Sequence, residues 1–181
     1  MVTRLLARSP SESAAAPKET IMEEKAVSIL DARRIMTVAT VRPDGWPQTT
    51  IVGYANDGLT IYFLIERTSQ KFSNIERDNR ISVAIGEEPR DLRHVRAVYA
   101  AARAIEITDQ AQRELAWRLL MQRHPNLRDY ELPDASLAAM MRADCQHVSA
   151  LDFILGQRPG GTSTLEPSRA DAWGGEPASA V

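Results

Sequence analysis

Hydrophobic residues in the middle of the chain recur in short runs that are typical of β-strands. Between Arg80 and Glu87, the apolar residues Ile81, Val83 and Ile85 alternate with smaller or polar ones, which predicts a half-buried strand. The other runs are rich in β-branched and apolar residues, which also favours strands. The sequence predicts six strands, over residues 35–41, 48–54, 59–65, 80–87, 95–107 and 146–154, the fifth bent near residues 100–102.

Two turn signals join the first three strands directly. Residues 42–45 are Arg-Pro-Asp-Gly and residues 56–58 are Asn-Asp-Gly, and both sequences favour tight turns. Tight turns connect antiparallel strands. Because few residues remain to cover the edges of such a sheet, we expect it to close on itself as a small antiparallel barrel.

Helices are expected around this sheet. Thr20 and Glu23 fit a capping box that would start a helix ending near residue 32. Its apolar positions recur at helical spacing and are Met22, Ala26, Ile29 and Leu30. Further helices are predicted over about residues 69–77, 109–124 and 134–142. The helix over 109–124 would be capped by Thr108 or Asp109, with an apolar side made of Ala111, Leu115, Ala116, Leu119 and Leu120.

The two ends of the chain differ in composition from the middle. Residues 9–17 are small and polar, and the chain after about residue 160 is rich in Gly, Pro, Ser and Ala. Such segments cannot bury enough apolar surface to fold. We therefore expect a flexible leader at 1–19, one folded domain at 20–158 and a flexible tail at 159–181.

The composition argues against several classes of protein. Twenty-two Lys and Arg against 24 Asp and Glu give a net charge of −2, without a basic run that could hold nucleic acid. Cys145 is the only cysteine and the three histidines are far apart in sequence, so no disulfide or metal site is expected. No apolar run approaches the roughly 20 residues of a transmembrane helix. The sequence predicts a cytoplasmic protein that binds neither nucleic acid nor membrane.

Arg67, Thr68, Ser69 and Lys71 lie where a predicted strand passes into a predicted helix. The N-terminus of a helix carries free N–H groups and the positive end of the helix dipole, both of which favour phosphate. Lys71 adds a full charge, and the two hydroxyl groups add hydrogen-bond donors. The cluster is therefore either a phosphate site without a glycine-rich loop or an ordinary helix cap flanked by two solvated basic side chains.

Several short motifs follow one another in a fixed order within residues 21–155. They are Asp44-Gly45-x-Pro47, Asp57-Gly58, Thr68-Ser69-x-Lys71-x-x-Asn74-Ile75, Arg80-Ile81-Ser82-Val83-Ala84-Ile85 and Ala102-Arg103-Ala104. Their order and spacing resemble the pyridoxamine 5′-phosphate oxidase-like family of flavin-binding proteins. The resemblance implies a mainly β fold with flanking helices, built on a six-stranded antiparallel split β-barrel.

The resemblance also implies a cofactor site. Ser69 and Lys71 would hold the FMN phosphate with Arg67 and Thr68 adjacent, whereas Asn74 would hydrogen-bond from its helix to a loop and not contact the cofactor. The flavin ring would lie beside Gln48, Thr49, Thr50, Ile51, Val52 and Ile65. For Thr49 and Thr50 the alternative is an ordinary role in a solvated strand. Related split barrels bind the deazaflavin F420 or haem, which are the alternative cofactors.

The expected function is that of an FMN-dependent oxidoreductase. The flavin would exchange a hydride or electrons with a nicotinamide donor or a small organic substrate, so the protein needs no acid, base or nucleophile set of its own. Residues 151–161 differ from the Arg-x-His type of segment with which pyridoxamine phosphate oxidases hold their substrate, so that substrate is not predicted. The alternatives are an F420-dependent reductase and a non-catalytic flavin- or haem-binding module.

The resemblance further implies a homodimer with its cofactors between the two subunits. Trp46, Tyr54, Val98 and Tyr99 lie on predicted strands and cannot all face one small interior. Surplus apolar surface of this kind is best buried against a second copy. We therefore expect those that the barrel leaves outside its interior to contribute to a dimer interface.

Overall fold

The computed structural model describes residues 16–86, 94–154 and 163–165, so most of the predicted leader and tail lies outside the described residues. The helices are α1 (Ala16–Asp31), α2 (Gln70–Arg77), α3 (Gln110–Arg123) and the short 3₁₀ helix η1 (Pro125–Leu127). The strands are β1 (Ile35–Val41), β2 (Pro47–Gly53), β3 (Ala55–Asp57), β4 (Thr60–Glu66), β5 (Arg80–Gly86), β6 (His94–Glu106), β7 (Ala138–Ile154) and β8 (Ser163–Leu165).

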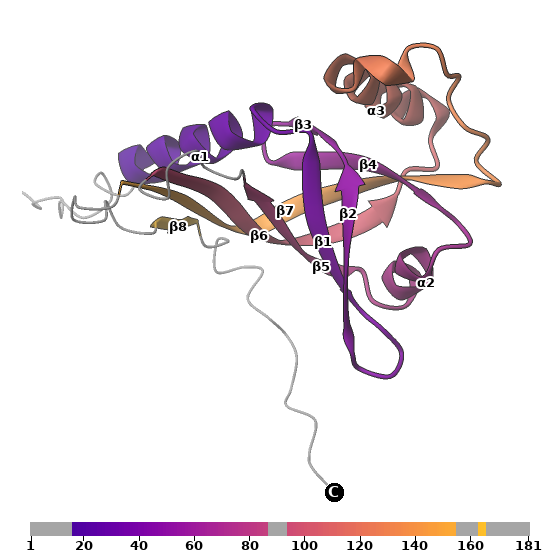
Figure 1. Ribbon diagram of the computed structural model, residues 1–181, viewed down its shortest axis with the longest axis horizontal. Coiled ribbons are helices and arrows are strands. Elements are labelled where there is room, and N and C mark those ends of the chain that lie inside the picture. Colours follow the sequence, from indigo (N-terminus) through magenta and orange to yellow (C-terminus); the bar gives the residue numbers. More distant parts are fainter. Residues whose placement is uncertain (1–15, 87–93, 155–162, 166–181) are drawn as a thin grey trace, which may run out of the picture.

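All these strands belong to one antiparallel sheet (Figure 1). Its order is β2-β1-β5-β6-β7-β4-β3, and β8 pairs with β7. Six strands have seven or more residues, and only β3 and β8 are as short as three, so the predicted six-stranded antiparallel architecture is confirmed. The sheet curls until β2 lies against β4, but the two strands share no ladder of hydrogen bonds. We call this unzipped seam between β2 and β4 the split.

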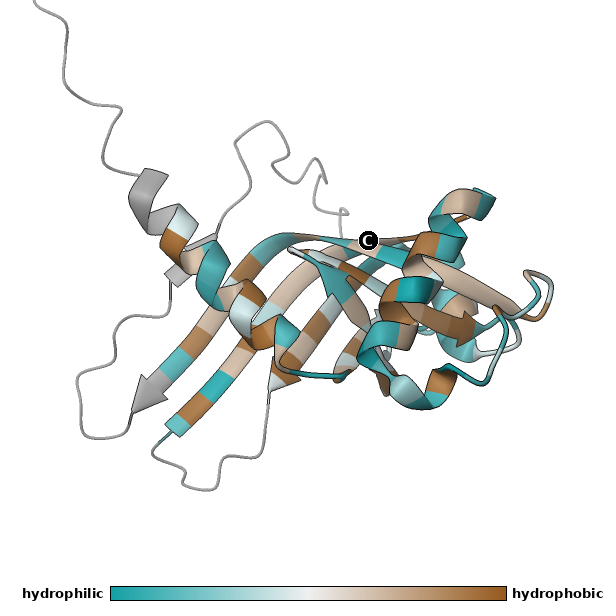
Figure 2. Cartoon of the chain, turned by 90° about the horizontal axis from the view of Figure 1, so that it is seen from above, coloured by the Kyte–Doolittle hydropathy of each residue, from teal (hydrophilic) through white to brown (hydrophobic). Residues whose placement is uncertain are grey.

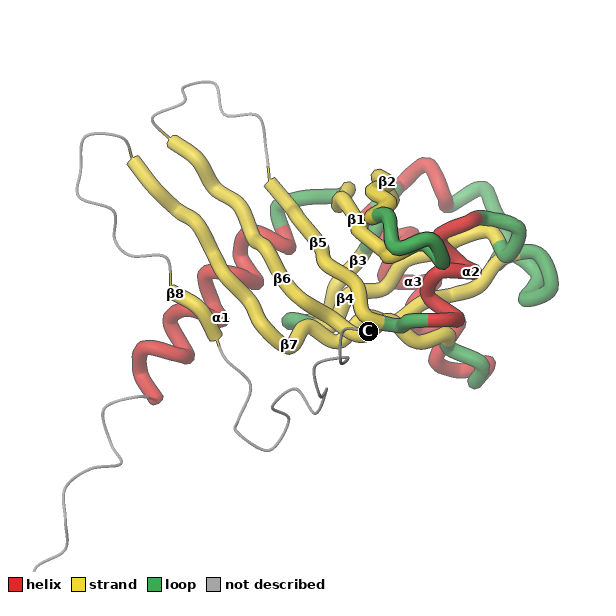
Figure 3. Tube along the Cα trace, turned by 90° about the horizontal axis from the view of Figure 1, so that it is seen from below, coloured by secondary structure: helices red, strands yellow, loops and turns green. Residues whose placement is uncertain are grey.

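The interior of the barrel is filled by the alternating positions that the sequence predicts. Ile81, Val83 and Ile85 of β5 are all buried. Helix α1 crosses the long strands β6 and β7 and closes the barrel on that side (Figure 3). Its buried face consists of the four predicted residues Met22, Ala26, Ile29 and Leu30. In Figure 2 the strands beside α1 alternate between brown and teal, as expected for strands with one face in the core.

The first hairpin has the conformation that its sequence favours. Gly45 has a φ of 84°, which side chains other than glycine rarely adopt. Asp44 Oδ1 accepts a hydrogen bond from the Trp46 N–H (3.2 Å), and the Arg42 N–H donates to Trp46 O (2.9 Å). This is a turn followed by a glycine bulge, a common way to close a short hairpin.

Two predictions about helices are wrong. Residues 138–142 belong to β7, not to a helix over 134–142, because β7 pairs with β4 on one side and with β6 on the other. The segment Ala-Ala-Met-Met-Arg-Ala favours a helix intrinsically, but its strand is covered on both faces and shows no alternation. Helix α1 begins at Ala16, so Thr20 lies within the helix and is not its cap.

Helix α3 begins at its predicted cap, but its buried side is rotated from the predicted one. Asp109 Oδ1 accepts a hydrogen bond from the Gln112 N–H (2.9 Å). Leu115, predicted to be apolar and inward, is 43% exposed, whereas Trp117 is buried. The predicted bend in the fifth strand coincides with a register shift between Ala101 and Ala102 of β6. None of the helices in the described ranges is long and apolar enough to cross a membrane.

Candidate functional site

The predicted flavin strand, β2, is an edge strand with one free side. It pairs with β1 alone, and its other side borders the split. The hydrogen bond from Arg42 N–H to Trp46 O sets the alternation of the β1–β2 ladder, which directs the peptide groups of Thr49 and Ile51 away from β1. These peptide groups can therefore bind a planar molecule edge-on.

The side chains of β2 alternate between the two faces of the strand. Gln48, Thr50 and Val52 are half-buried, whereas Thr49 and Ile51 are exposed. The hydroxyl oxygen of Thr50 is buried and has no hydrogen-bond partner among the described residues. A buried polar atom without a partner is uncommon in a folded protein and marks a position where a ligand can supply the missing bond. The free edge and the orphaned hydroxyl both fit a heteroaromatic cofactor.

A buried asparagine ties the start of β2 to helix α2. Asn74 is fully buried, and its Nδ2 donates to Thr40 Oγ1 (2.9 Å) and to Gln48 Oε1 (3.0 Å). Its Oδ1 accepts from Gln70 Nε2 (3.0 Å). Asn74 does hydrogen-bond within the protein as predicted, but its partners lie on β1, β2 and α2 and not in a loop. The amide fixes the N-terminal half of α2 beside the predicted flavin strand.

The N-terminus of α2 has unused hydrogen-bonding capacity. Ser69 is the N-cap: its Oγ accepts from the Phe72 N–H (3.4 Å) and donates to Glu66 O (2.6 Å). The N–H groups of Gln70 and Lys71 have no backbone acceptor in the described part of the chain. Lys71 is half-buried and forms no ion pair with the described residues, and Thr68 is exposed. Two free amides and one ammonium group are suited to an anion.

Arg67 is already engaged within the protein. Its Nη2 forms an ion pair with Glu106, and its Nε donates to Ala135 O (2.5 Å). Its guanidinium also lies over the Phe72 ring, 5.0 Å from the centroid. Ile65 is only 3% exposed and faces the core, so it can offer a ligand its backbone but not its side chain. Of the two basic residues in the motif, Lys71 is the one whose charge is uncompensated.

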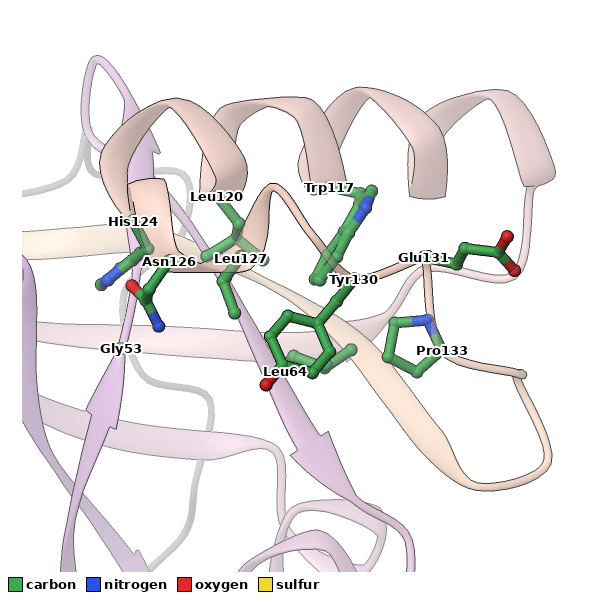
Figure 4. Close-up of a pocket in the computed structure, with 10 residues that line it drawn as sticks. All are labelled: Gly53, Leu64, Trp117, Leu120, His124, Asn126, Leu127, Tyr130, Glu131 and Pro133. Carbon is green, nitrogen blue, oxygen red and sulfur yellow. The ribbon is translucent and has the colours of Figure 1, made fainter.

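A pocket of about 440 Å³ lies at the opposite end of β2, between β4 and helix α3 (Figure 4). Strands β2 and β4 run in opposite directions, so Gly53 at the end of β2 lies far along the split from α2. The apolar wall of the pocket is formed by Leu64, Trp117, Leu120, Leu127 and Pro133. Its polar groups belong to His124, Asn126, Tyr130 and Glu131.

A side chain at Gly53 would crowd the imidazole ring of His124. A Cβ atom added there would lie 3.2 Å from His124 Cε1 and 3.3 Å from Nε2. His124 Nε2 in turn lies 3.0 Å from Tyr54 O, and because a carbonyl only accepts, this nitrogen carries the proton. Tyr54 itself is buried and donates its hydroxyl to Leu30 O (2.7 Å), and burial raises the pKa of its phenol.

The last residue of α3 fastens this end of the molecule. Arg123 Nη1 donates to three backbone carbonyls, those of Leu30 (2.8 Å), Asp31 (2.7 Å) and Arg33 (2.8 Å). Its Nη2 donates to Asn56 Oδ1 (2.9 Å). These carbonyls lie at the C-terminus of α1, which has none of its own basic residues in the last turn. Arg123 thereby locks α3 and the pocket onto the barrel.

Other reactive groups do not form a second centre. Burial raises the pKa of the Cys145 thiol to about 12, so the thiol stays protonated and unreactive near neutral pH. Within the described ranges, no group of three His, Cys, Asp or Glu side chains could hold a metal ion.

Residues 22–152 match the model of the family described as pyridoxamine 5′-phosphate oxidase. The chain belongs to the pyridoxamine 5′-phosphate oxidase family. This confirms the resemblance seen in the sequence motifs. No curated protein gives a significant match to the chain.

Solved structures share the fold of this family member. A haem-binding protein from Mycobacterium smegmatis superposes with a TM-score of 0.66 at 18% identity, over 80% of this chain and 57% of that one. A FAD-binding protein from Mesorhizobium loti gives 0.57 at 22% identity, over 70% and 91%. An F420 reductase gives 0.54 at 22% identity, over 67% and 94%. This chain thus spans little more than half of the haem-binding protein.

Sequence reasoning missed the residues that form the pocket of this family member. His124, Trp117 and Tyr130 come from α3 and the loop after it, which contact β2 and β4 only in the folded chain. Gly53 was an available signal, because a glycine inside a predicted strand indicates close approach of another group. That signal gives a position in the chain but does not name the partner.

Proposed function

We propose that this chain is an FMN-binding oxidoreductase and that the flavin lies in the split, along the free edge of β2. The proposal rests above all on one arrangement: the unpartnered amides of Gln70 and Lys71, with the Lys71 ammonium, are fixed beside β2 by Asn74. The phosphate would bind at these groups. The flavin would then meet the exposed peptide groups of Thr49 and Ile51 and the orphaned hydroxyl of Thr50.

In this proposal each side chain has a defined role. Lys71 neutralises one phosphate charge, and Ser69 shapes the helix terminus that supplies the amides. Arg67, held by Glu106, supports the loop before α2 and does not carry the phosphate. The bound flavin would supply the redox chemistry by accepting and giving up a hydride. A nicotinamide donor or another small organic molecule would be its reaction partner.

The names of the similar structures mention three further cofactors. Their names include a FAD-binding protein, an F420 reductase and a haem-binding protein. A haem needs an iron ligand, and neither β2 nor the start of α2 offers a His, Cys or Met side chain. The single uncompensated cation at Lys71 suits one phosphate group. These points favour FMN, with F420 as the alternative.

We also propose that the working unit is a homodimer. Of the four residues that were not expected all to face one small interior, Tyr54 and Val98 are buried in the core. Trp46 and Tyr99 are 71% and 51% exposed, and Ile51 on β2 is 70% exposed. Of these, Trp46 and Ile51 are apolar side chains on or next to the proposed flavin strand, and they support a partner that covers the cofactor. Light scattering should find a dimer whose dissociation on dilution releases the cofactor.

The direct test of this function uses the purified full-length chain. FMN, F420 and haemin are each added, and the melting temperature and the absorption spectrum of the bound cofactor are measured. FMN should raise the melting temperature, because a ligand of the native state stabilises it. Turnover of a nicotinamide donor would establish an enzyme, whereas tight FMN binding without turnover of any donor would establish a binding module. No response to FMN would contradict the proposal.

A further inference from the structure

The pocket under α3 has the size and lining of a small-molecule site. Its volume of about 440 Å³ falls within the range of about 300–1,000 Å³ that is usual for ligand pockets. Figure 4 shows Trp117 from α3, Tyr130 from the loop after η1 and Leu64 from β4 gathered around the same space. Trp117 is 7% exposed and is therefore rigidly held, whereas Tyr130 is 66% exposed and lies at the mouth. Such a pair of aromatic rings favours a flat, apolar ligand.

The charge of the pocket lining restricts the ligand further. Among the described residues that line it, Glu131 is acidic and none is Lys or Arg. Glu131 is exposed and makes no ion pair with the described residues, and its carboxylate points away from Leu64 and Tyr130 (Figure 4), so its negative charge acts on a ligand from the edge of the pocket. His124 and Asn126 add hydrogen-bonding groups without a fixed charge near the Gly53 wall. This lining disfavours an anion and accepts a neutral molecule or a cation.

Two arginines near the pocket do not change this balance. Arg123 is bound to three carbonyls of α1 and lies 3.4 Å from the Asp31 carboxylate. Arg113 is 4% exposed and donates through Nη2 to Pro133 O (3.0 Å), and it does not line the pocket. The Nη1 of Arg113 is buried without a partner, so a ligand anion that reached it would find a free donor. A preference for cationic ligands would therefore indicate recognition by Glu131, and a preference for anionic ligands would indicate recognition by Arg113.

We propose that this pocket binds a flat aromatic or heteroaromatic molecule that is neutral or positively charged. Gly53 is the last residue of β2 and also part of the pocket wall, so the ligand would lie at the end of the proposed flavin strand away from Lys71. The pocket thereby indicates a substrate class for the oxidoreductase. The inference that the bound molecule is the substrate rests on the proposed function, whereas the inference that the pocket binds it does not. Binding itself requires no flavin.

Three probes with the same ring test the proposal: indole, tryptamine and indolepropionate. They are neutral, cationic and anionic, and their binding to the full-length chain is measured by calorimetry without added flavin. Tryptamine should bind about tenfold more tightly than indolepropionate, because one carboxylate attracts the first and repels the second. Indole should bind between the two. Equal affinities for the two charged probes, or a preference for indolepropionate, would overturn the proposal.

Two variants place the binding within the pocket. Glu131→Lys should reverse the preference toward indolepropionate, while Asp129→Lys, an equally exposed neighbour that does not line the pocket, should leave the order unchanged. Leu127→Trp should fill the space and weaken all three probes. Unchanged binding in Leu127→Trp, measured on folded protein by circular dichroism, would exclude the pocket as the site.

The same measurements separate this proposal from the proposed function. Lys71→Ala should leave tryptamine binding unchanged, because Lys71 lies at the other end of the split. A chain that binds tryptamine but no flavin would refute the flavin site and retain the pocket. A chain that binds FMN but none of the probes would refute the pocket alone.

Discussion

The two ends of the split differ in whether the polar groups beside the open strand already have hydrogen-bond partners within the protein. At the α2 end, the described amides of Gln70 and Lys71 and the Lys71 ammonium have no protein partner. At the α3 end, Arg123 and His124 direct their polar atoms to backbone carbonyls, and the remaining surface is largely apolar. One end has free donors, and the other has a fixed shape.

This difference indicates how each end would select a ligand. Groups without a partner gain hydrogen bonds when a ligand arrives, so the α2 end should contribute affinity through charge. Satisfied groups contribute nothing new on binding, but they hold the wall in place, so the α3 end should contribute through shape and through Glu131. Substitutions at the α3 end should therefore change stability first, and substitutions at the α2 end should change binding first.

The largest effect is expected for Arg123→Ala. The substitution removes one donor from each of three carbonyls near the C-terminus of α1, of which Leu30 O keeps the Tyr54 hydroxyl, and we expect the free energy of unfolding to fall by about 3 kcal/mol. Urea unfolding followed by circular dichroism measures this change. The control Arg118→Ala, on the exposed side of α3, should change it by less than about 0.5 kcal/mol. Equal effects of the two variants would mean that Arg123 does not fasten α3.

A binding effect without a stability effect is expected for Lys71→Ala. A charge-assisted hydrogen bond contributes about 1.5–3 kcal/mol, so FMN should bind roughly tenfold to a hundredfold more weakly. Flavin fluorescence titration measures the dissociation constant. Lys25→Ala is the matched control, because this lysine lies on α1, far from the split, and pairs with Asp152 of β7. An unchanged FMN affinity in Lys71→Ala would show that the phosphate binds elsewhere.

Asn74→Ala tests the connection between α2 and β2. Thr40 and Gln48 would each lose a donor within a buried network, and the free energy of unfolding should fall by about 1.5 kcal/mol. Thermal and urea unfolding both report this change. Asn126→Ala, an exposed asparagine at the other end of the split, should have little effect on stability. If the two asparagines prove equivalent, the buried network does not stabilise the barrel.

The smallest effect is expected for Gly53→Ala. The new Cβ would lie 3.2 Å from His124 Cε1, so the ring must shift slightly, at a cost of about 1 kcal/mol or less. A double-mutant cycle with His124→Ala isolates this contact, because the penalty should disappear when the ring is absent. A penalty that persists in the His124→Ala background would assign it to the backbone of β2.

Much of the fold could be predicted because it depends on local patterns. The alternation of Ile81, Val83 and Ile85 and the helical spacing of Met22, Ala26 and Ile29 report buried faces directly. The first half of β7 could not be predicted, because Ala139 and Met140 favour a helix. In the folded chain their strand lies between β4 and β6, and Met140 packs in the hydrophobic cluster under α3. Here tertiary pairing overrides intrinsic propensity.

The candidate site likewise combines local features, which the sequence predicts, with contacts between distant residues, which it does not. The Ser69 cap is local, since its partners lie within three residues, and the sequence predicts it. The engagement of Arg67 by Glu106 joins residues 39 positions apart, and the contact of His124 with Tyr54 spans 70 positions. Such contacts leave no periodic signal in the sequence. They nevertheless decide which cation is free and where the pocket lies.

The central claim, that the α2 end binds the flavin phosphate through Lys71, is tested most directly by comparing FMN with riboflavin, which lacks the phosphate. The dissociation constants of both are measured for the parent chain and for Lys71→Ala. The account predicts that the parent prefers FMN by about tenfold or more and that Lys71→Ala loses most of this preference. A preference for FMN that is equally strong in Lys71→Ala would contradict it.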